Sequence, residues 1–148
     1  MKKFSHLDGG GRAKMVDVGN KPPQLRIAVA EGSVTCQPET ISALREKKLP
    51  KGDVFTVAKV AAILAAKRVD ALIPLCHSLR LDSVAVHFYL RQNLVHIAAE
   101  VRTTAKTGVE MEALTAVSVA ALTIYDMCKA VDKTMVIEGV RLVTKIKK

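Results

Sequence analysis

An aspartate and a lysine stand three residues apart at the end of the longest uncharged run of the chain. That run covers residues 113–125; Asp126 follows it directly, and Lys129 comes about one helical turn later. On an exposed helix the two would form an ordinary ion pair worth about 0.2–0.5 kcal/mol. Beside a run this apolar they would be partly desolvated, which makes them candidates for proton exchange near neutral pH.

Two more lysines stand just before expected helices, where they could help to bind phosphate. Lys51 precedes a helix start at Gly52-Asp53, and Lys106 precedes Thr107-Gly108. Because the first N–H groups of a helix attract anions, an ammonium beside them would complete a phosphate site. The glycine spacing after Lys106 does not make a P-loop, and an exposed loop lysine is the alternative at both places. Arg26 is a third candidate cation.

A histidine and a glutamate complete the set of candidate residues. His77 follows Cys76 in the stretch 73–79, which Pro74 predicts to be extended or a loop. A lone histidine in such a place is more often structural than catalytic. Glu112 falls in the first turn of an expected helix, where an acid also complements the helix dipole. No second ligand stands at a suitable spacing from His77, so no metal site is predicted.

The composition favours a phosphorylated small molecule as the partner. Basic residues outnumber acidic ones by 23 to 14, a net charge of +9, which attracts anions. Aromatic residues make up only 3% of the chain and are scattered, which disfavours the stacking of single-stranded bases. A small phosphorylated substrate is therefore favoured over nucleic acid, and a basic nucleic-acid-binding protein is the alternative.

The cysteines and the apolar runs predict a cytoplasmic protein. The three cysteines are far apart and form no C-x-x-C pair, which predicts neither disulfides nor a zinc knuckle. No apolar stretch follows Lys2 and Lys3, so we expect no secretory signal. The longest uncharged run has 13 residues, fewer than the roughly 20 that a membrane helix needs, so we expect no membrane partner.

Hydrophobic periodicity predicts an α+β fold in which helices cover one face of a ferredoxin-like antiparallel sheet. Residues 1–23 are expected to be a flexible N-terminal segment and residues 24–148 a single α+β catalytic domain. Strands are expected from Leu25 to Cys36 and from about 135 to 146, with a hairpin turning at Gln92-Asn93 whose polar face carries the solvated His87 and His96. Helices are expected at residues 38–49, 53–70 and 108–131.

The third expected helix predicts an oligomer. It is apolar nearly all round, although a two-layer domain leaves one face of each helix open, so a second copy is expected to cover that face. Glu112 and Asp126 bracket its apolar run on one face, but 14 residues of helix place them about 21 Å apart. They would share a site only if it were built between two copies of the chain.

Six strings of the sequence resemble the cyclic pyranopterin monophosphate synthase family, the molybdenum-cofactor biosynthesis protein C family. They occur in the family's order, at residues 15–18, 51–55, 65–68, 73–77, 106–115 and 122–130. The resemblance implies a ferredoxin-like subunit in a homohexamer, a trimer of dimers with active sites between subunits. It also implies a phosphorus–oxygen lyase that converts a cyclised dihydro-guanosine triphosphate to cyclic pyranopterin monophosphate and pyrophosphate. No cofactor is implied, although Mg²⁺ could arrive with the triphosphate.

The resemblance assigns roles to individual residues. The family's substrate-binding segments match Leu75, Cys76, His77, Met111 and Glu112. Asp126 matches the family's active-site residue, and Lys51 and Lys129 match lysines implicated in the chemistry. The family usually has proline after the histidine, where this chain has Ser78, which puts the rigidity of that loop in question. A structural relative without activity is a further alternative.

Overall fold

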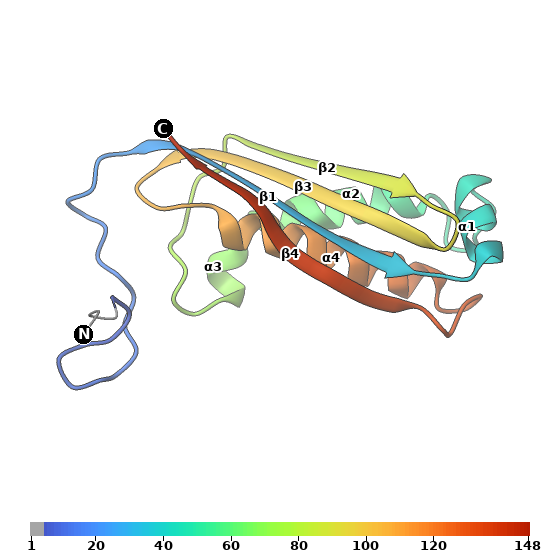
Figure 1. The fold of residues 1–148 in the computed structure, drawn as a ribbon, viewed down its shortest axis with the longest axis horizontal. Helices are drawn as coiled ribbons and strands as arrows, with labels where there is room; N and C mark the ends of the chain where they lie inside the picture. The colour runs from blue at the N-terminus through green and yellow to red at the C-terminus, as the bar shows by residue number, and fades with distance from the viewer. Residues whose placement is uncertain (1–4) are drawn as a thin grey trace.

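Four long strands form one antiparallel sheet, and the helices lie on one face of it (Figure 1). The computed structural model describes residues 5–148. The strands are β1 (Gln24–Thr35), β2 (Ser83–Leu90), β3 (Leu94–Ala105) and β4 (Val136–Lys147), in the spatial order β2-β3-β1-β4. With one helical segment between β1 and β2 and another between β3 and β4, this order is the ferredoxin-like arrangement, as predicted.

The helices are α1 (Pro38–Arg45), α2 (Val54–Ala66), α3 (Val69–Leu72) and α4 (Glu110–Cys128). Asp53 caps α2 as expected, because its carboxylate accepts a hydrogen bond from the N–H of Thr56 at 3.2 Å. The prediction of one helix from Asp53 to Asp70 was wrong. Arg68, at φ −125°, leaves the helical region, so α2 ends before it and α3 begins as a separate short helix.

The predicted hairpin is present in the expected register. Val84 pairs with Val101 and Leu90 with Val95, which puts the apolar residues of both strands on the side of the helices. On the other side His87 is exposed, whereas His96 is half-buried, 3.6 Å from Glu31. The expectation of two solvated histidines therefore holds only for His87.

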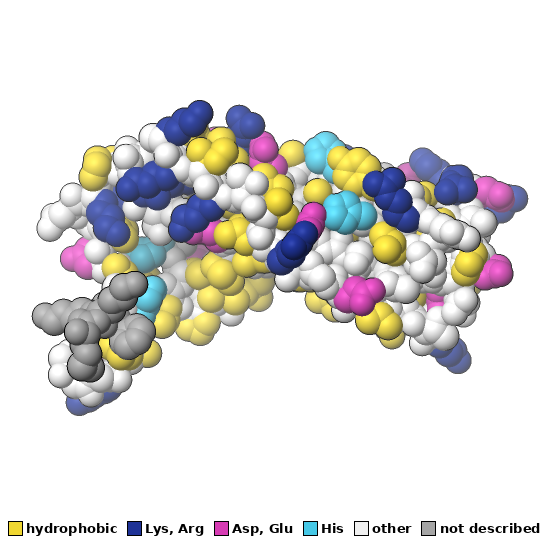
Figure 2. Space-filling model, viewed as in Figure 1, with side chains coloured by type: hydrophobic (Ala, Val, Ile, Leu, Met, Phe, Trp, Pro, Cys, Tyr) yellow, Lys and Arg dark blue, Asp and Glu magenta, His cyan; other side chains and the backbone are white. Residues whose placement is uncertain are grey.

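The two faces of β1 differ in what covers them. Ala28, Ala30 and Val34 are buried under the helices, and β1 pairs with β3 without a break in register. The alternating Leu25, Ile27 and Val29 therefore lie on the face that no helix covers. Figure 2, which has the view of Figure 1, shows charged, histidine and apolar side chains mixed on this side of the molecule.

Helix α4 is the core helix of the fold, packed against α2 and three strands. Gly32 lets it approach β1 closely, because a Cβ there would lie only 2.9 Å from Cγ1 of Val117 and 3.0 Å from Cγ2 of Val140. By length and mean hydropathy, 1.3, α4 is also the one helix among residues 5–148 apolar enough to cross a membrane. Half of that stretch is buried inside the fold, as in a core helix.

The N-terminal segment runs from a small turn to the start of β1. Leu7 and Ala13 form an isolated bridge around the turn, in which the carboxylate of Asp8 accepts hydrogen bonds from the N–H groups of Gly10 and Arg12, both at 2.8 Å. The segment then passes beside the loop after α3 (Figure 1). Flexibility was expected for residues 1–23. The first four of these residues, which include Lys2 and Lys3, lie outside the described residues.

Candidate functional site

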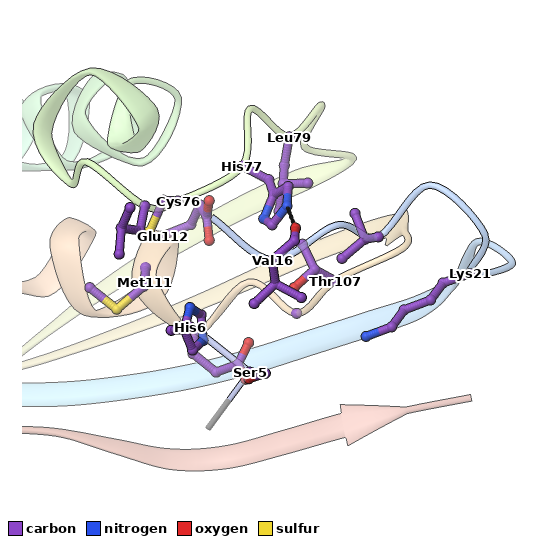
Figure 3. A pocket seen from close by; sticks show the side chains of 14 residues that line it. Ser5, His6, Val16, Lys21, Cys76, His77, Leu79, Thr107, Met111 and Glu112 are labelled. Atoms are coloured by element: carbon purple, nitrogen blue, oxygen red, sulfur yellow. Dashed lines mark hydrogen bonds between the residues drawn. The ribbon is translucent and has the colours of Figure 1, made fainter. Parts of the chain in front are cut away.

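A hollow of about 400 Å³ opens where the N-terminal segment crosses the loop after α3 and the first turn of α4 (Figure 3). The residues that line it are Ser5, His6, Val16, Val18, Lys21, Leu75, Cys76, His77, Leu79, Thr107, Gly108, Glu110, Met111 and Glu112. All five residues of the segments 75–77 and 111–112 are among them. The structure therefore brings together, in one chain, the two segments expected to bind substrate.

Glu112 is the buried acid of this hollow, with only 4% of its surface exposed. Burial raises the pKa of its carboxyl group, and the neighbouring carboxylates of Glu110 and Asp70 raise it further. Cys76 lies beside it, and burial together with the charge of Glu112 raises the pKa of the thiol, which favours the neutral thiol over the thiolate. The hollow thus holds two groups, Glu112 and Cys76, that release their protons less readily than usual.

Ser78 ties the loop of the hollow to α3. Its hydroxyl donates a hydrogen bond to the carboxylate of Asp70, whose other oxygen accepts from the N–H of Ala71 at 3.1 Å. Asp70 therefore both fixes the loop next to His77 and contributes to the raised pKa of Glu112.

The two other expected phosphate ligands lie beside the hollow and not in its wall. Lys106 lines a second hollow of about 320 Å³ that shares His77 and Thr107 with the first, and its ammonium lies 2.6 Å from the carbonyl oxygen of Gly19. Arg26 contacts the backbone of Lys106, with Nη2 3.4 Å from the Lys106 carbonyl oxygen, and its Nε is buried and unpartnered among the described residues. The guanidinium thus keeps one unused donor.

A second cluster of candidate residues lies at the other end of α4. Nζ of Lys51, from the turn before α2, lies 3.1 Å from Oδ2 of Asp126 and 3.0 Å from its backbone carbonyl. Nζ of Lys129 lies 2.7 Å from Oδ1 of the same carboxylate. Gly52 makes the turn possible, because its φ of +90° favours a residue without Cβ.

The two lysines favour the charged form of Asp126, and its carboxylate in turn binds both ammonium groups. Hydrogen bonds from Lys129 and Lys51 lower the pKa of the Asp126 carboxyl group. The hydrogen bond to Asp126 raises the pKa of Lys129. The side chains of Lys51, Asp126 and Lys129 are each about half exposed in the single chain. In a single chain the cluster is therefore a fixed pair of cations around one anion.

One chain does not unite the two clusters. Glu112 is in the first turn of α4 and Asp126 in its last, so the helix separates them by about 21 Å. Each cluster also opens to solvent at its own end of the helix. One chain therefore carries two separate clusters, and the intersubunit site predicted from the sequence stays a prediction.

The part of the hollow that sequence reasoning missed comes from the N-terminal segment. His6, Val16, Val18 and Lys21 line the hollow, although the segment was expected to be flexible. The available signal was the pair Val16 and Val18 in an otherwise polar stretch.

In residues 5–148 no three His, Cys, Asp or Glu side chains are arranged to hold a metal ion.

Comparison with known proteins shows the family of the chain. Residues 15–147 match the MoaC family. A cyclic pyranopterin monophosphate synthase of Chloroflexus aggregans is 59% identical over 145 residues, which are 97% of this chain and 88% of the relative. Proteins of the same name from Roseiflexus sp. and Magnetococcus marinus are 58% and 54% identical over 147 residues, 98% of this chain and 93% and 90% of the relatives. The chain belongs to the MoaC family.

Proposed function

We propose that this protein is a cyclic pyranopterin monophosphate synthase of molybdenum cofactor biosynthesis. It takes a cyclised dihydro-guanosine triphosphate and releases cyclic pyranopterin monophosphate and pyrophosphate, the reaction of a phosphorus–oxygen lyase. The observation that carries the proposal is the placement of the two family segments, 75–77 and 111–112, around one hollow of nucleotide size, about 400 Å³. The names of relatives more than 50% identical support the same activity.

Release of pyrophosphate requires cations where negative charge develops. Lys51 and Lys129, both held by Asp126, form a pair of ammonium groups suited to the phosphate chain. Because these donors are held in place before the reaction, they stabilise the departing charge without reorganising. Lys106 and the free Nε of Arg26 supply further positive charge near the hollow.

Formation of the pterin ring requires several proton transfers. Glu112, whose pKa is raised by burial, is suited to donate a proton, and His77 to accept one. Asp126 orients Lys129 and completes the acid–base set. Mg²⁺ could enter with the triphosphate, whose oxygen atoms are suitable ligands for it.

The complete site is assembled from two copies of the chain in a homohexamer, a trimer of dimers, in the cytoplasm. One copy contributes the hollow with His77 and Glu112, and the other contributes Lys51, Asp126 and Lys129. Exposed apolar side chains support such an assembly: Val57, Val60 and Leu64 of α2 and Leu122 of α4 are between 45% and 59% exposed. A packed second copy would bury them and exclude water from the shared site.

Mixing two inactive variants tests both the reaction and the composite site. Lys51→Met and His77→Gln are each expected to release almost no pyrophosphate from the cyclised nucleotide. When the two variants are co-expressed, mixed pairs regain one intact site, so about a quarter of the sites should be active for two-fold related subunits.

Two controls make the experiment decisive. Lys59→Met, on the exposed side of α2, removes a lysine of the same helical region and should leave turnover unchanged. Co-expression of Lys51→Met with Glu112→Gln should also restore activity, whereas Lys51→Met with Lys129→Met should not. Lack of pyrophosphate release by the unmodified protein would overturn the proposed reaction, and lack of recovery in the mixtures would overturn the shared site.

A further inference from the structure

The N-terminal segment, residues 5–23, crosses the hollow as a strap. It contributes five of the lining residues, and two side chains of the body hold its backbone. His77 lies with Nε2 2.7 Å from the carbonyl oxygen of Val16, and the ammonium of Lys106 lies 2.6 Å from that of Gly19. Both contacts therefore bind strap carbonyls with residues that belong to the proposed site.

The contact with Val16 determines which nitrogen of His77 carries the proton. A backbone carbonyl can only accept a hydrogen bond, so Nε2 must be the donor. A neutral imidazole has a single N–H group, which leaves Nδ1 as a bare acceptor. In Figure 3 the ring edge opposite the Val16 contact faces the side of the hollow where Cys76 and Glu112 lie.

The strap holds the Val16 carbonyl in place through its own turns. The N–H of Gly19 donates to the carboxylate of Asp17 at 2.7 Å, and the N–H of Lys21 donates to the carbonyl of Val18 at 3.0 Å. Val16 and Val18 are themselves half-buried against the hollow. The acceptor that meets His77 is thus part of a local structure and not the end of a loose chain.

We propose that the strap is a positioning element of this site: the Val16 carbonyl keeps the proton of His77 on Nε2 and presents Nδ1 to the hollow as a proton acceptor. In this form Nδ1 takes a proton from an N–H or O–H group of the bound nucleotide. The electron pair of that bond stays on the nucleotide, and His77 becomes an imidazolium with N–H groups on both sides. The role of Nδ1 as a proton acceptor rests on the proposed function, whereas the assignment of the ring proton to Nε2 does not.

The charged and titratable groups around the ring come from every element that forms the hollow. They are His6 and Lys21 of the strap, Cys76 of the loop, and Glu110 and Glu112 of α4 in the first hollow, with Arg80 and Lys106 in the second hollow, which His77 also lines. Among the described residues none of these groups is hydrogen-bonded to the ring, whereas the carbonyl oxygen of Val16 lies 2.7 Å from Nε2. The carbonyl of Val16 is therefore the group that sets the tautomer.

Nitrogen-15 spectra of the full-length protein test the tautomer without substrate, because the two neutral tautomers give distinct ring-nitrogen shifts. The chain has four histidines, and the signals lost in His77→Gln identify those of His77. At alkaline pH, where a free imidazole is neutral, we expect His77 to carry its proton on Nε2. A proton on Nδ1, or a mixture like that of free histidine, would overturn the proposal.

A loosened strap provides the second test. Val16→Gly combined with Val18→Gly removes the two anchoring side chains, and Val136→Gly with Val143→Gly removes two exposed valines of β4, outside the strap, by the same chemistry. The first variant should give a mixed tautomer and at least a several-fold lower kcat, and the second should match the unmodified protein. An unchanged His77 tautomer in the first variant would contradict the role of the strap. If the tautomer shifts while no variant or parent releases pyrophosphate, the reaction is wrong and the strap assignment stands.

Discussion

Nζ of Lys129 lies 2.7 Å from Oδ1 of Asp126, one turn earlier on α4, while the other oxygen of that carboxylate faces Lys51 at 3.1 Å. Asp126 is thus the one anion between two cations. Its pKa is lowered by hydrogen bonds from the lysines, and the pKa of Lys129 is raised by the bond to it. The carboxylate fixes the position of both ammonium groups before any substrate arrives.

Replacing Asp126 with Asn should abolish most of the turnover while the fold and the oligomer survive. The amide has nearly the same shape, but it loses the charge that holds the lysines. We expect kcat for pyrophosphate release to fall about 100-fold or more, the range for lost acid–base or charge stabilisation. Asp82→Asn is the matched control, since Asp82 is exposed and its carboxylate bonds to no described residue. Near-normal turnover of Asp126→Asn would refute its assignment.

Glu112→Gln should lower activity and raise stability at neutral pH. The folded state raises the pKa of this carboxyl group, so its contribution to stability is fully present below the ordinary pKa of glutamate and is lost as the pH rises through the folded-state value. Glutamine cannot ionise, so the variant should melt at a higher temperature than the parent at neutral pH.

The stability difference should shrink as the pH falls towards the ordinary glutamate value. Glu39→Gln, an exposed acid in the first turn of α1, is the control and should show no such pattern. Thermal unfolding across the pH range measures both variants. A Glu112→Gln protein that melts below the parent at neutral pH would show that the charged form is the stabilised one.

The sequence predicted those parts of the fold whose residues interact locally or in regular pairs. The hairpin register from Val84 to Val101 was predictable, because only one alignment matched apolar residues on both strands. The cap at Asp53 was a local signal as well. The end of α2 was not, because residues 67–70 have adequate helix propensity and only the backbone at Arg68 shows the break.

The candidate site was less predictable, because it depends on contacts between distant segments. Lys51 and Asp126 are 75 residues apart, and no periodicity links them. The strap contact between His77 and Val16 spans 61 residues and uses a backbone carbonyl, which has no signature in the sequence. The resemblance supplied the residue types, and the helix spacing predicted that Glu112 and Asp126 stand far apart along α4, whereas the contacts of each with distant segments required the structure.

Ser78→Ala should weaken substrate binding, whereas Ser78→Pro should bind substrate as well as the parent does. The hydroxyl of Ser78 donates to Asp70 and so fixes the loop that carries Cys76 and His77, at the position where the family usually has proline. The N–H of Ser78 donates to no described acceptor, so a proline there would cost no hydrogen bond and would stiffen the loop. A hydrogen bond of this kind contributes about 0.5–1.5 kcal/mol, equivalent to a roughly 2- to 10-fold higher KM in Ser78→Ala.

Steady-state kinetics with the cyclised nucleotide distinguish loop positioning from general destabilisation. Ser78→Ala should raise KM with little change in melting temperature, and Ser78→Thr, which keeps a hydroxyl, should resemble the parent. If alanine and proline raise KM equally, the hydroxyl acts by something other than loop rigidity.

Asp132→Ala should destabilise the fold strongly at neutral pH and much less in acid. The buried carboxylate accepts from the N–H of Gln37 at 2.8 Å and the hydroxyl of Thr40 at 3.0 Å, which ties the turn after α4 to the start of α1. Burial alone would raise the pKa of Asp132, but the hydrogen bonds from Gln37, Thr134 and Thr40 outweigh it and lower the pKa.

The downward direction of the Asp132 pKa shift determines how the stability of the fold depends on pH. A lowered folded-state pKa gives stability that is present above the ordinary pKa of aspartate and is lost as the pH falls through the folded-state value. Alanine leaves buried donors without partners, so we expect a loss of about 1–3 kcal/mol at neutral pH, measured by denaturant unfolding. Asp82→Ala should change the free energy of unfolding by less than about 0.5 kcal/mol at every pH. A loss in Asp132→Ala that stays constant down to strongly acid pH would mean that packing, and not the charged carboxylate, holds α1 against the end of α4.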